Sequence, residues 1–151
     1  MYPIFDIRDK QELLDDVVHY YWKQWGTDSN YQFYKDCIEH SCKTESDVPR
    51  FYIIMDNTRI IGSYALLRSE LNSRQDLTPW LACLFVDPTY RGGNLGALLQ
   101  KHALEQTSAR GYRRLYLCTE LTGYYERTGW TYMGDGYLLN DERTRIYEQE
   151  V

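Results

Sequence analysis

The most informative segment of this chain reads LFVDPTYRGGNLGALL and runs from Leu84 to Leu99. It begins with an apolar strand pattern, continues as a glycine-rich turn and ends with apolar residues at helical spacing. The amides in the first turn of a helix lack intrahelical partners, and the helix dipole places roughly half a positive charge there. This strand-turn-helix junction therefore predicts a binding site for a phosphate group.

The glycines of the turn favour close approach of an anion to the backbone. Gly92, Gly93 and Gly96 carry no side chain that would hold a diphosphate away from the amides. Asn94 is one of the few other residues that tolerates unusual backbone angles. We therefore expect the turn to form even though this position is not glycine.

Two common phosphate-binding motifs do not fit this segment. A P-loop ends in Gly-Lys-Ser/Thr, whereas Gly96 is followed here by Ala97 and Leu98. A dinucleotide fingerprint has Gly-x-Gly-x-x-Gly early in a strand-helix-strand unit, with an acidic residue about 20 residues further on. The spacing here differs, and the turn lies past the middle of the chain, so both motifs are disfavoured.

The junction resembles motif A of the GNAT superfamily of N-acetyltransferases, which reads Arg/Gln-x-x-Gly-x-Gly/Ala after a strand ending in Val-x-Pro. Here the strand ends at Val86 to Pro88 and the motif runs from Arg91 to Gly96, with Asn94 where the family usually has glycine. The segment from Tyr124 to Trp130 is similar to the family's Tyr-Glu-x-x-Gly-Phe element. One helix and one strand fit between the two motifs, and the resemblance covers about residues 51–137.

The pattern of the remaining chain predicts alternating strands and helices. Strands are expected at residues 4–8, 51–55, 59–68, 80–86, 114–118, 130–137 and 143–148, and helices after Asp9, after Asn30, over 94–110 and around 122–128. The resemblance implies an α/β (α+β) fold with a mixed, mostly antiparallel sheet of six to seven strands. It also implies helices on both faces and a splayed parallel strand pair.

Length and charge set limits on the class of protein. A chain of 151 residues buries about 70% of its unfolded surface, so we expect a single N-acetyltransferase domain over residues 1–151. The formal net charge of −5, without a cluster of lysines and arginines, disfavours nucleic acid and anionic membranes as partners. There is no apolar run of roughly 20 residues and no signal-peptide pattern, which predicts a soluble cytoplasmic protein.

The cysteines give no sign of a metal site. Cys37, Cys42, Cys83 and Cys118 form no Cys-x-x-Cys pair, so we expect neither zinc nor a disulfide framework.

The resemblance implies acetyl-CoA as co-substrate. In the family, the pantetheine arm enters the gap between the splayed strands and pairs with their exposed backbone groups, which are costly to bury without partners. The main-chain amide of Phe85 or of a neighbour would polarise the acetyl carbonyl. The residues expected to bind the cofactor are Leu84, Phe85 and Val86 through their backbones, and Arg91, Gly92, Gly93, Asn94, Leu95, Gly96 and Ala97 around the diphosphate.

The resemblance also implies Tyr125 as the general acid. This residue matches the family's tyrosine before glutamate, and a phenol with a pKa near 10 can protonate a departing thiolate; Tyr124 is the alternative. The glutamate that many relatives carry in the strand before motif A is missing here. Glu120 is the preferred general base, ahead of Glu70 and Asp76, acting directly or through water.

These features predict direct transfer of an acetyl group from acetyl-CoA to a primary amine in a ternary complex. Aromatic side chains concentrated over residues 20–34, close to carboxylates, would hold a small cation. The alternatives are an N-terminal protein or peptide acetyltransferase and a non-catalytic acyl-CoA sensor. A homodimer is a further option, because the final strand could pair with a second subunit or be sealed within one chain.

Overall fold

The computed structural model describes all residues, 1–151, and divides into two compact units. The first unit comprises Met1–Ala65 and Cys83–Leu99, and the second comprises Leu66–Ala82 and Gln100–Val151. The α-helices are α1 (Leu14–Trp25), α2 (Tyr31–Ser41) and α3 (Leu95–Ala109), and short 3-10 turns form η1 (Ile7–Asp9), η2 (Gln11–Leu13), η3 (Pro88–Tyr90) and η4 (Tyr125–Thr128). None of the helices has the length and apolar character that crossing a membrane requires.

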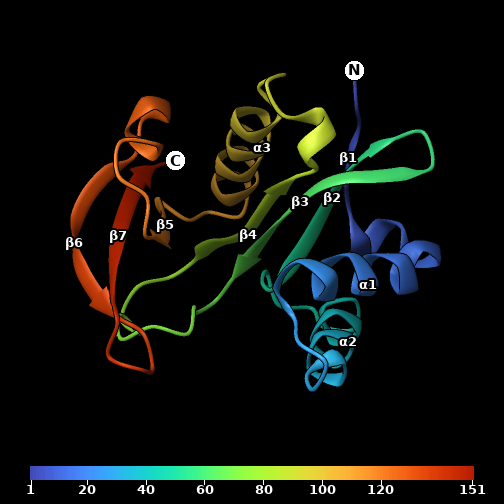
Figure 1. The fold of residues 1–151 in the computed structure, drawn as a ribbon, viewed down its shortest axis with the longest axis horizontal. Coiled ribbons are helices and arrows are strands. Elements are labelled where there is room, and N and C mark those ends of the chain that lie inside the picture. The colour runs from blue at the N-terminus through green and yellow to red at the C-terminus, as the bar shows by residue number, and fades with distance from the viewer. The chain divides into compact units, whose positions relative to one another are not determined.

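The strands form one mixed sheet in the order β1-β2-β3-β4-β5-β7-β6 (Figure 1). Their bounds are β1 (Ile4–Asp6), β2 (Arg50–Asp56), β3 (Arg59–Leu67), β4 (Trp80–Val86), β5 (Arg114–Thr119), β6 (Thr131–Tyr137) and β7 (Arg143–Glu150). β4 and β5 are parallel and share one register pair, Trp80 opposite Tyr116. The predicted fold class, a mostly antiparallel sheet with a parallel pair, is confirmed.

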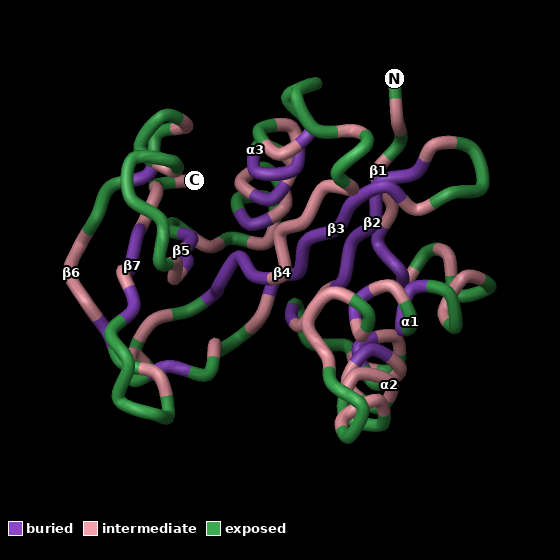
Figure 2. Tube along the Cα trace, in the orientation of Figure 1, coloured by how far each residue is buried: buried purple, intermediate pink, exposed green.

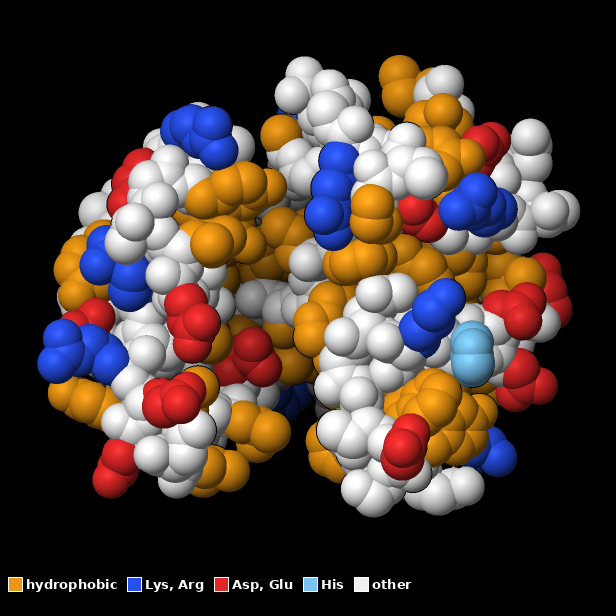
Figure 3. Space-filling view, viewed as in Figure 1, with side chains coloured by type: hydrophobic (Ala, Val, Ile, Leu, Met, Phe, Trp, Pro, Cys, Tyr) orange, Lys and Arg blue, Asp and Glu red, His pale blue; other side chains and the backbone are white.

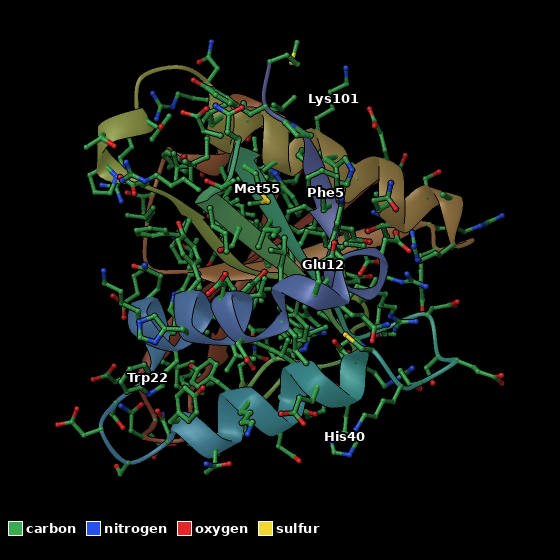
Figure 4. All side chains as sticks on the ribbon, turned by 90° about the vertical axis from the view of Figure 1, so that its right-hand side faces the viewer. Phe5, Glu12, Trp22, His40, Met55 and Lys101 are labelled. Carbon is green, nitrogen blue, oxygen red and sulfur yellow. The ribbon has the colours of Figure 1, made fainter.

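In the first unit, β2 and β3 form the core. Five consecutive residues of β2, Phe51 to Met55, are buried, and Figure 2 shows the buried residues continuing along β3. The helices α1 and α2 lie side by side on one side of these strands (Figures 1 and 4). The hydroxyl of Tyr21 in α1 lies 2.7 Å from the carbonyl oxygens of both Tyr52 and Tyr64, so one buried phenol joins the helix to two strands.

The entry to α1 differs from the sequence expectation. The chain forms two 3-10 turns over Ile7–Asp9 and Gln11–Leu13 before α1 begins at Leu14. Asp6 caps the first 3-10 turn, where its side chain accepts a hydrogen bond from the amide of Arg8 at 2.9 Å. The N-cap of α1 itself is Leu13, without a side-chain hydrogen bond, and not the expected Asp9. Asp6 also pairs with Arg50 at 2.8 Å, and this long-range contact outweighs the local pattern.

In the second unit, β5, β7 and β6 form an antiparallel ladder. The final strand β7 is paired on both sides, by β5 and β6, so it is sealed within the chain. Around residues 122–128 the expected helix is only the 3-10 turn η4. Gln100 of α3 is buried, and its Oε1 accepts hydrogen bonds from Thr128 and Trp130 at 2.7 and 3.0 Å, which fixes that turn against the helix.

Candidate functional site

The loop from β4 to α3, residues 87–94, is the predicted phosphate-binding segment, and Asp87 fixes its beginning. The Asp87 carboxylate accepts hydrogen bonds from the Thr89 amide at 3.1 Å and from the Arg59 guanidinium at 3.0 Å. Donation from Thr89, followed by the contact with Arg59, lowers the pKa of Asp87. The Asp87 amide also donates to the carbonyl of Ile61 at 2.8 Å. The loop therefore starts from a position held by β3.

Tyr90 provides a second anchor for the same loop. Its hydroxyl donates a 2.5 Å hydrogen bond to Asp56 at the end of β2, and this bond raises the pKa of Tyr90. The Tyr90 ring packs edge-on against Tyr2, with ring centres 5.8 Å apart, and the Arg59 guanidinium lies 5.6 Å from its centre.

The turn itself has the backbone shape that the sequence predicts. Gly92 has φ +90° and Asn94 has φ +61°, so asparagine takes the left-handed conformation that we expected it to tolerate. A Cβ at Gly92 would meet nothing within 4 Å, and one at Gly93 would meet only the Tyr90 carbonyl at 3.8 Å. The backbone of the turn is therefore open to a ligand.

The N-terminus of α3 has backbone amides without intrahelical partners next to this turn. The amide of Leu98 donates to the Asn94 carbonyl at 3.0 Å, the first bond of the helical ladder. The preceding amides, those of Leu95 to Ala97, have no acceptor within the helix. Together with the dipole of a helix of 15 residues, they can hold a diphosphate such as that of coenzyme A.

Arg91 folds back over the end of β4. Its Nε donates to the Val86 carbonyl at 3.0 Å, and its guanidinium carbon lies 5.5 Å from the centre of the Phe85 ring. The residue remains exposed, so its positive charge stays available to an anion beside the loop.

The middle of β4 has an irregular backbone. Cys83 has φ +54°, and its carbonyl accepts a hydrogen bond from the Ser63 hydroxyl at 3.0 Å. A left-handed residue inside a strand interrupts regular pairing and redirects the residues that follow. Gly62 allows the close approach of β3, since a Cβ there would lie 2.8 Å from the Phe85 carbonyl. The first unit thus brings together every residue that we predicted to bind the cofactor, Leu84 to Val86 and Arg91 to Ala97.

Tyr125 lies in the second unit, at the start of η4, and is half-buried among aromatic rings. Its ring centre is 4.9 Å from Tyr124, 6.1 Å from Tyr147 and 6.3 Å from Trp130. Burial, then the neighbouring Tyr124 and Cys118, raise the pKa of Tyr125 to about 12. The phenol is therefore protonated at neutral pH, as a general acid must be.

The residues after Tyr125 explain why its motif contains glutamate and glycine. Glu126 accepts a 2.9 Å hydrogen bond from the Tyr147 hydroxyl of β7. Gly129 has φ +94°, and a Cβ there would lie 2.9 Å from the Gln149 amide nitrogen. The motif therefore fastens the turn that carries Tyr125 to the neighbouring strand.

The three carboxylates considered as general base have different surroundings. Glu120 is exposed, directly after β5. Asp76 is exposed and bound to Arg74 at 2.8 Å, which lowers its pKa. Glu70 is half-buried, its carboxylate lies 4.0 Å from the Cys118 sulfur, and burial raises its pKa. The sequence gives no signal for this burial, because Glu70 lies in a loop without periodicity.

The aromatic residues of α1 and α2 contact both one another and the strands. Tyr20 and Trp25 each lie 6.1 Å from the ring of Phe85 in β4. Trp22 lies near the end of α1 that leads to α2 (Figure 4), donates to the Thr27 carbonyl at 2.7 Å and contacts the ring of Tyr31 at 5.4 Å. Tyr21 is fully buried. Figure 3 shows hydrophobic side chains over α1 and α2 interspersed with charged ones. Nowhere in the structure are three or more His, Cys, Asp or Glu side chains placed to hold a metal ion.

Comparison with known proteins agrees with this geometry. The sequence model of the acetyltransferase (GNAT) family matches residues 11–130. A stretch of 97 residues is 30% identical to the amino-acid acetyltransferase of Shewanella oneidensis, covering 64% of this chain and 20% of that protein. The chain thus spans about a fifth of the length of this curated relative.

Solved structures share the fold over nearly the whole chain. A GNAT-family protein from Desulfovibrio desulfuricans superimposes with a TM-score of 0.74 at 16% identity, covering 99% of each chain. An aminoglycoside 6′-N-acetyltransferase complexed with coenzyme A gives 0.72 at 15% identity, covering 98% of this chain and 96% of that one. The predicted resemblance is confirmed, and because the family's sequence model matches most of its length, the chain belongs to the acetyltransferase (GNAT) family.

Proposed function

We propose that this chain is an N-acetyltransferase that moves the acetyl group of acetyl-CoA directly to a primary amine in a ternary complex. The proposal rests on the turn at Gly92 to Asn94, whose backbone is accessible to a ligand, and on the backbone amides without intrahelical partners at the N-terminus of α3. These groups suit the diphosphate of coenzyme A. Membership of the acetyltransferase family supplies the reaction type.

In this proposal the first unit binds the co-substrate. The amides from Gly92 to Ala97 hold the diphosphate, and Arg91 adds a positive charge beside it. The backbone of Leu84 to Val86 pairs with the pantetheine arm, and an amide in this stretch donates to the acetyl oxygen. Such a donor stabilises the oxyanion, which in other acyl-transfer enzymes is worth about 10²–10³ in rate.

Tyr125 acts as the acid in the second half of the reaction. When the tetrahedral intermediate collapses, the carbon–sulfur bond breaks and the thiolate of coenzyme A takes the phenolic proton. The high pKa of Tyr125 supports this role because the phenol stays protonated until the thiolate forms. Glu120, Glu70 and Asp76 stay the candidate general bases, acting directly or through water.

The proposed acceptor is a small cation with a primary amine. One solved structure in the comparison is named an aminoglycoside 6′-N-acetyltransferase, and the curated relative is named an amino-acid acetyltransferase; both names support a primary amine as nucleophile. The proposed compartment is the cytoplasm.

Calorimetry with coenzyme A, followed by a thioester-cleavage screen against a panel of amines, tests the proposal. The panel contains alkyl polyamines, aminoglycosides, amino acids and short peptides. We expect binding of coenzyme A, turnover that favours cationic small amines, and intersecting initial-rate lines, as direct transfer requires. Parallel lines would indicate an acetyl-enzyme. Binding without turnover of any amine would identify an acyl-CoA sensor instead, and a preference for peptides would identify an N-terminal acetyltransferase.

A further inference from the structure

Glu70 differs from the other half-buried carboxylates of the second unit. Asp135 is bound to Tyr132 and Arg143, and Glu148 is bound to Arg114. The Glu70 carboxylate has neither a cation nor a hydroxyl beside it, and its only side-chain neighbour at hydrogen-bonding distance is the Cys118 thiol, at 4.0 Å. A carboxylate taken from water without a cation is costly, so this position is suited to receiving a cation from a ligand.

The side chains around Glu70 form a polar group that includes the predicted acid. Cys118 lies on β5 and contacts Glu70, and its thiol group is one of the causes that raise the pKa of Tyr125. Asn72 is only 6% exposed. The side chains of Asn72 and Thr144 hydrogen-bond the Cys118 thiol and lower its pKa, against the larger effect of burial. The second unit thus places a carboxylate that has no cationic partner beside a thiol that affects the pKa of Tyr125.

We infer that Glu70 is the general base of the proposed transfer and that its carboxylate binds the acceptor as a primary alkylammonium ion. The inference rests on the proposed function. The carboxylate takes one proton from the ammonium group, and the neutral amine uses its lone pair to form the new carbon–nitrogen bond to the acetyl carbon. Collapse of the intermediate breaks the carbon–sulfur bond, Tyr125 protonates the thiolate, and the amide nitrogen loses its second proton to water.

The surroundings of Glu70 favour this role over Glu120. Burial alone raises the pKa of Glu70, and no charged side chain contributes to the shift. Cys118, from β5, is the titratable group that faces it, and the pKa of that thiol is raised as well, so the thiol stays neutral and does not compete for the ammonium ion. Glu120 is exposed to water, which weakens both ion pairing and basicity.

The test compares Glu70→Gln with Glu120→Gln, the competing base, and with Glu142→Gln, an exposed carboxylate directly before β7, as the matched control. For each, kcat/KM is measured against pH with the best primary alkylamine of the panel, and coenzyme A affinity is measured by calorimetry. We expect Glu70→Gln to lower kcat/KM at neutral pH by about 10²–10³-fold. The kcat/KM of this variant should rise toward that of wild type as the pH approaches about 10, where an alkylamine loses its own proton. Glu142→Gln should stay within about threefold of wild type, far below what a lost base costs. Glu120→Gln should lose less than Glu70→Gln, and all three variants should bind coenzyme A as wild type does.

A second acceptor separates base catalysis from a structural role. A difluorinated analogue of the same amine, which is largely neutral at about pH 8, needs no base. Glu70→Gln should therefore transfer acetyl groups to it at nearly the wild-type rate. An equal loss with both acceptors would overturn the inference, as would an unchanged pH profile with the alkylamine.

The remaining outcomes also decide the matter. A large loss in Glu120→Gln with none in Glu70→Gln would assign the base to Glu120. If Glu70→Gln fails to bind coenzyme A, Glu70→Asp is tested in its place. We expect Glu70→Asp to have a lower kcat than wild type but to keep the rise of activity with pH that titration of a carboxylate produces. A Glu70→Asp variant with the kcat/KM of wild type would refute the role of Glu70 as base. A wild-type protein that binds coenzyme A but acetylates no amine would refute the proposed function itself, and this inference with it.

Discussion

The hydroxyl of Tyr90 donates a 2.5 Å hydrogen bond to the carboxylate of Asp56, and this contact ties the predicted phosphate-binding loop, residues 87–94, to the end of β2. Because the free amides of α3 follow only a few residues later, the position of the loop decides where those amides lie.

Replacing Tyr90 by Phe removes this bond but keeps the ring. We expect coenzyme A affinity to fall by up to about tenfold, because the loop loses one of its two anchors. Calorimetry with coenzyme A measures the change. Tyr112→Phe, in the loop between α3 and β5, is the control, and equal affinities in the two variants would show that the Tyr90 bond does not position the loop.

Substitutions at Asn94 test whether the left-handed conformation of the turn contributes to stability and coenzyme A binding. Asn94→Ala replaces a residue that tolerates left-handed angles with one that disfavours φ +61°, at a cost of about 1–2 kcal/mol. The variant should have a melting temperature lower by roughly 2–8 °C and weaker coenzyme A binding. Asn94→Gly adopts the same angle freely and should keep wild-type affinity. Thermal unfolding and calorimetry on the two variants measure these changes. An Asn94→Ala variant with the melting temperature and coenzyme A affinity of wild type would contradict the prediction.

A substitution at Gly62 tests whether the close contact between β3 and the end of β4 contributes to stability. A Cβ at Gly62 would lie 2.8 Å from the Phe85 carbonyl and 2.9 Å from the Ile54 side chain. Gly62→Ala should therefore destabilise the protein by about 1–3 kcal/mol, measured by urea unfolding. Gly93→Ala is the contrasting variant, since its Cβ would meet only the Tyr90 carbonyl at 3.8 Å, and it should unfold at the wild-type urea concentration.

Removal of the phenol of Tyr125 should slow the chemical step. Under saturating acetyl-CoA we expect Tyr125→Phe to lower kcat by about 10²–10⁴-fold without changing coenzyme A affinity. Tyr124→Phe should have a small effect, because Tyr124 is 38% exposed and packs beside the acid. A kcat of Tyr125→Phe within about threefold of wild type would show that Tyr125 is not the general acid.

The pH profile offers an independent check on the same residue. An acid works in its protonated form, so a raised pKa extends activity toward alkaline pH. Since the pKa of Tyr125 is raised to about 12, kcat corrected for thioester hydrolysis should not decline up to about pH 10, the ordinary pKa of tyrosine. A decline centred at or below that value would mean that another group supplies the proton.

The parts of the fold that follow from local pattern were predicted well. The helix expected at residues 94–110 is observed as Leu95–Ala109, and the strand expected at 80–86 is observed as Trp80–Val86. The turn before α3 was predictable because glycine and asparagine are the residues that adopt left-handed angles. The expected single domain over residues 1–151 stays a prediction.

The rest depends on contacts between distant residues. Asp9 has the local signature of a cap, but Asp6 caps the first turn because Arg50, far away in sequence, holds its carboxylate. Glu70 and Glu120 both lie outside regular elements, and only the folded chain shows that one is half-buried beside Cys118 and the other is exposed. The conformation of the loop before α3 was therefore more predictable from the sequence than the surroundings of the candidate bases.

The position of β7 between β5 and β6 has a consequence for synthesis on the ribosome. The two flanking strands emerge first, and the edges that β7 covers stay open until residues 143–150 leave the exit tunnel and insert between them. A nascent chain that stalls before this point carries these open strand edges, which are templates for aggregation. Emergence of residues 143–150 is therefore the step at which β5 and β6 lose the edges that face each other.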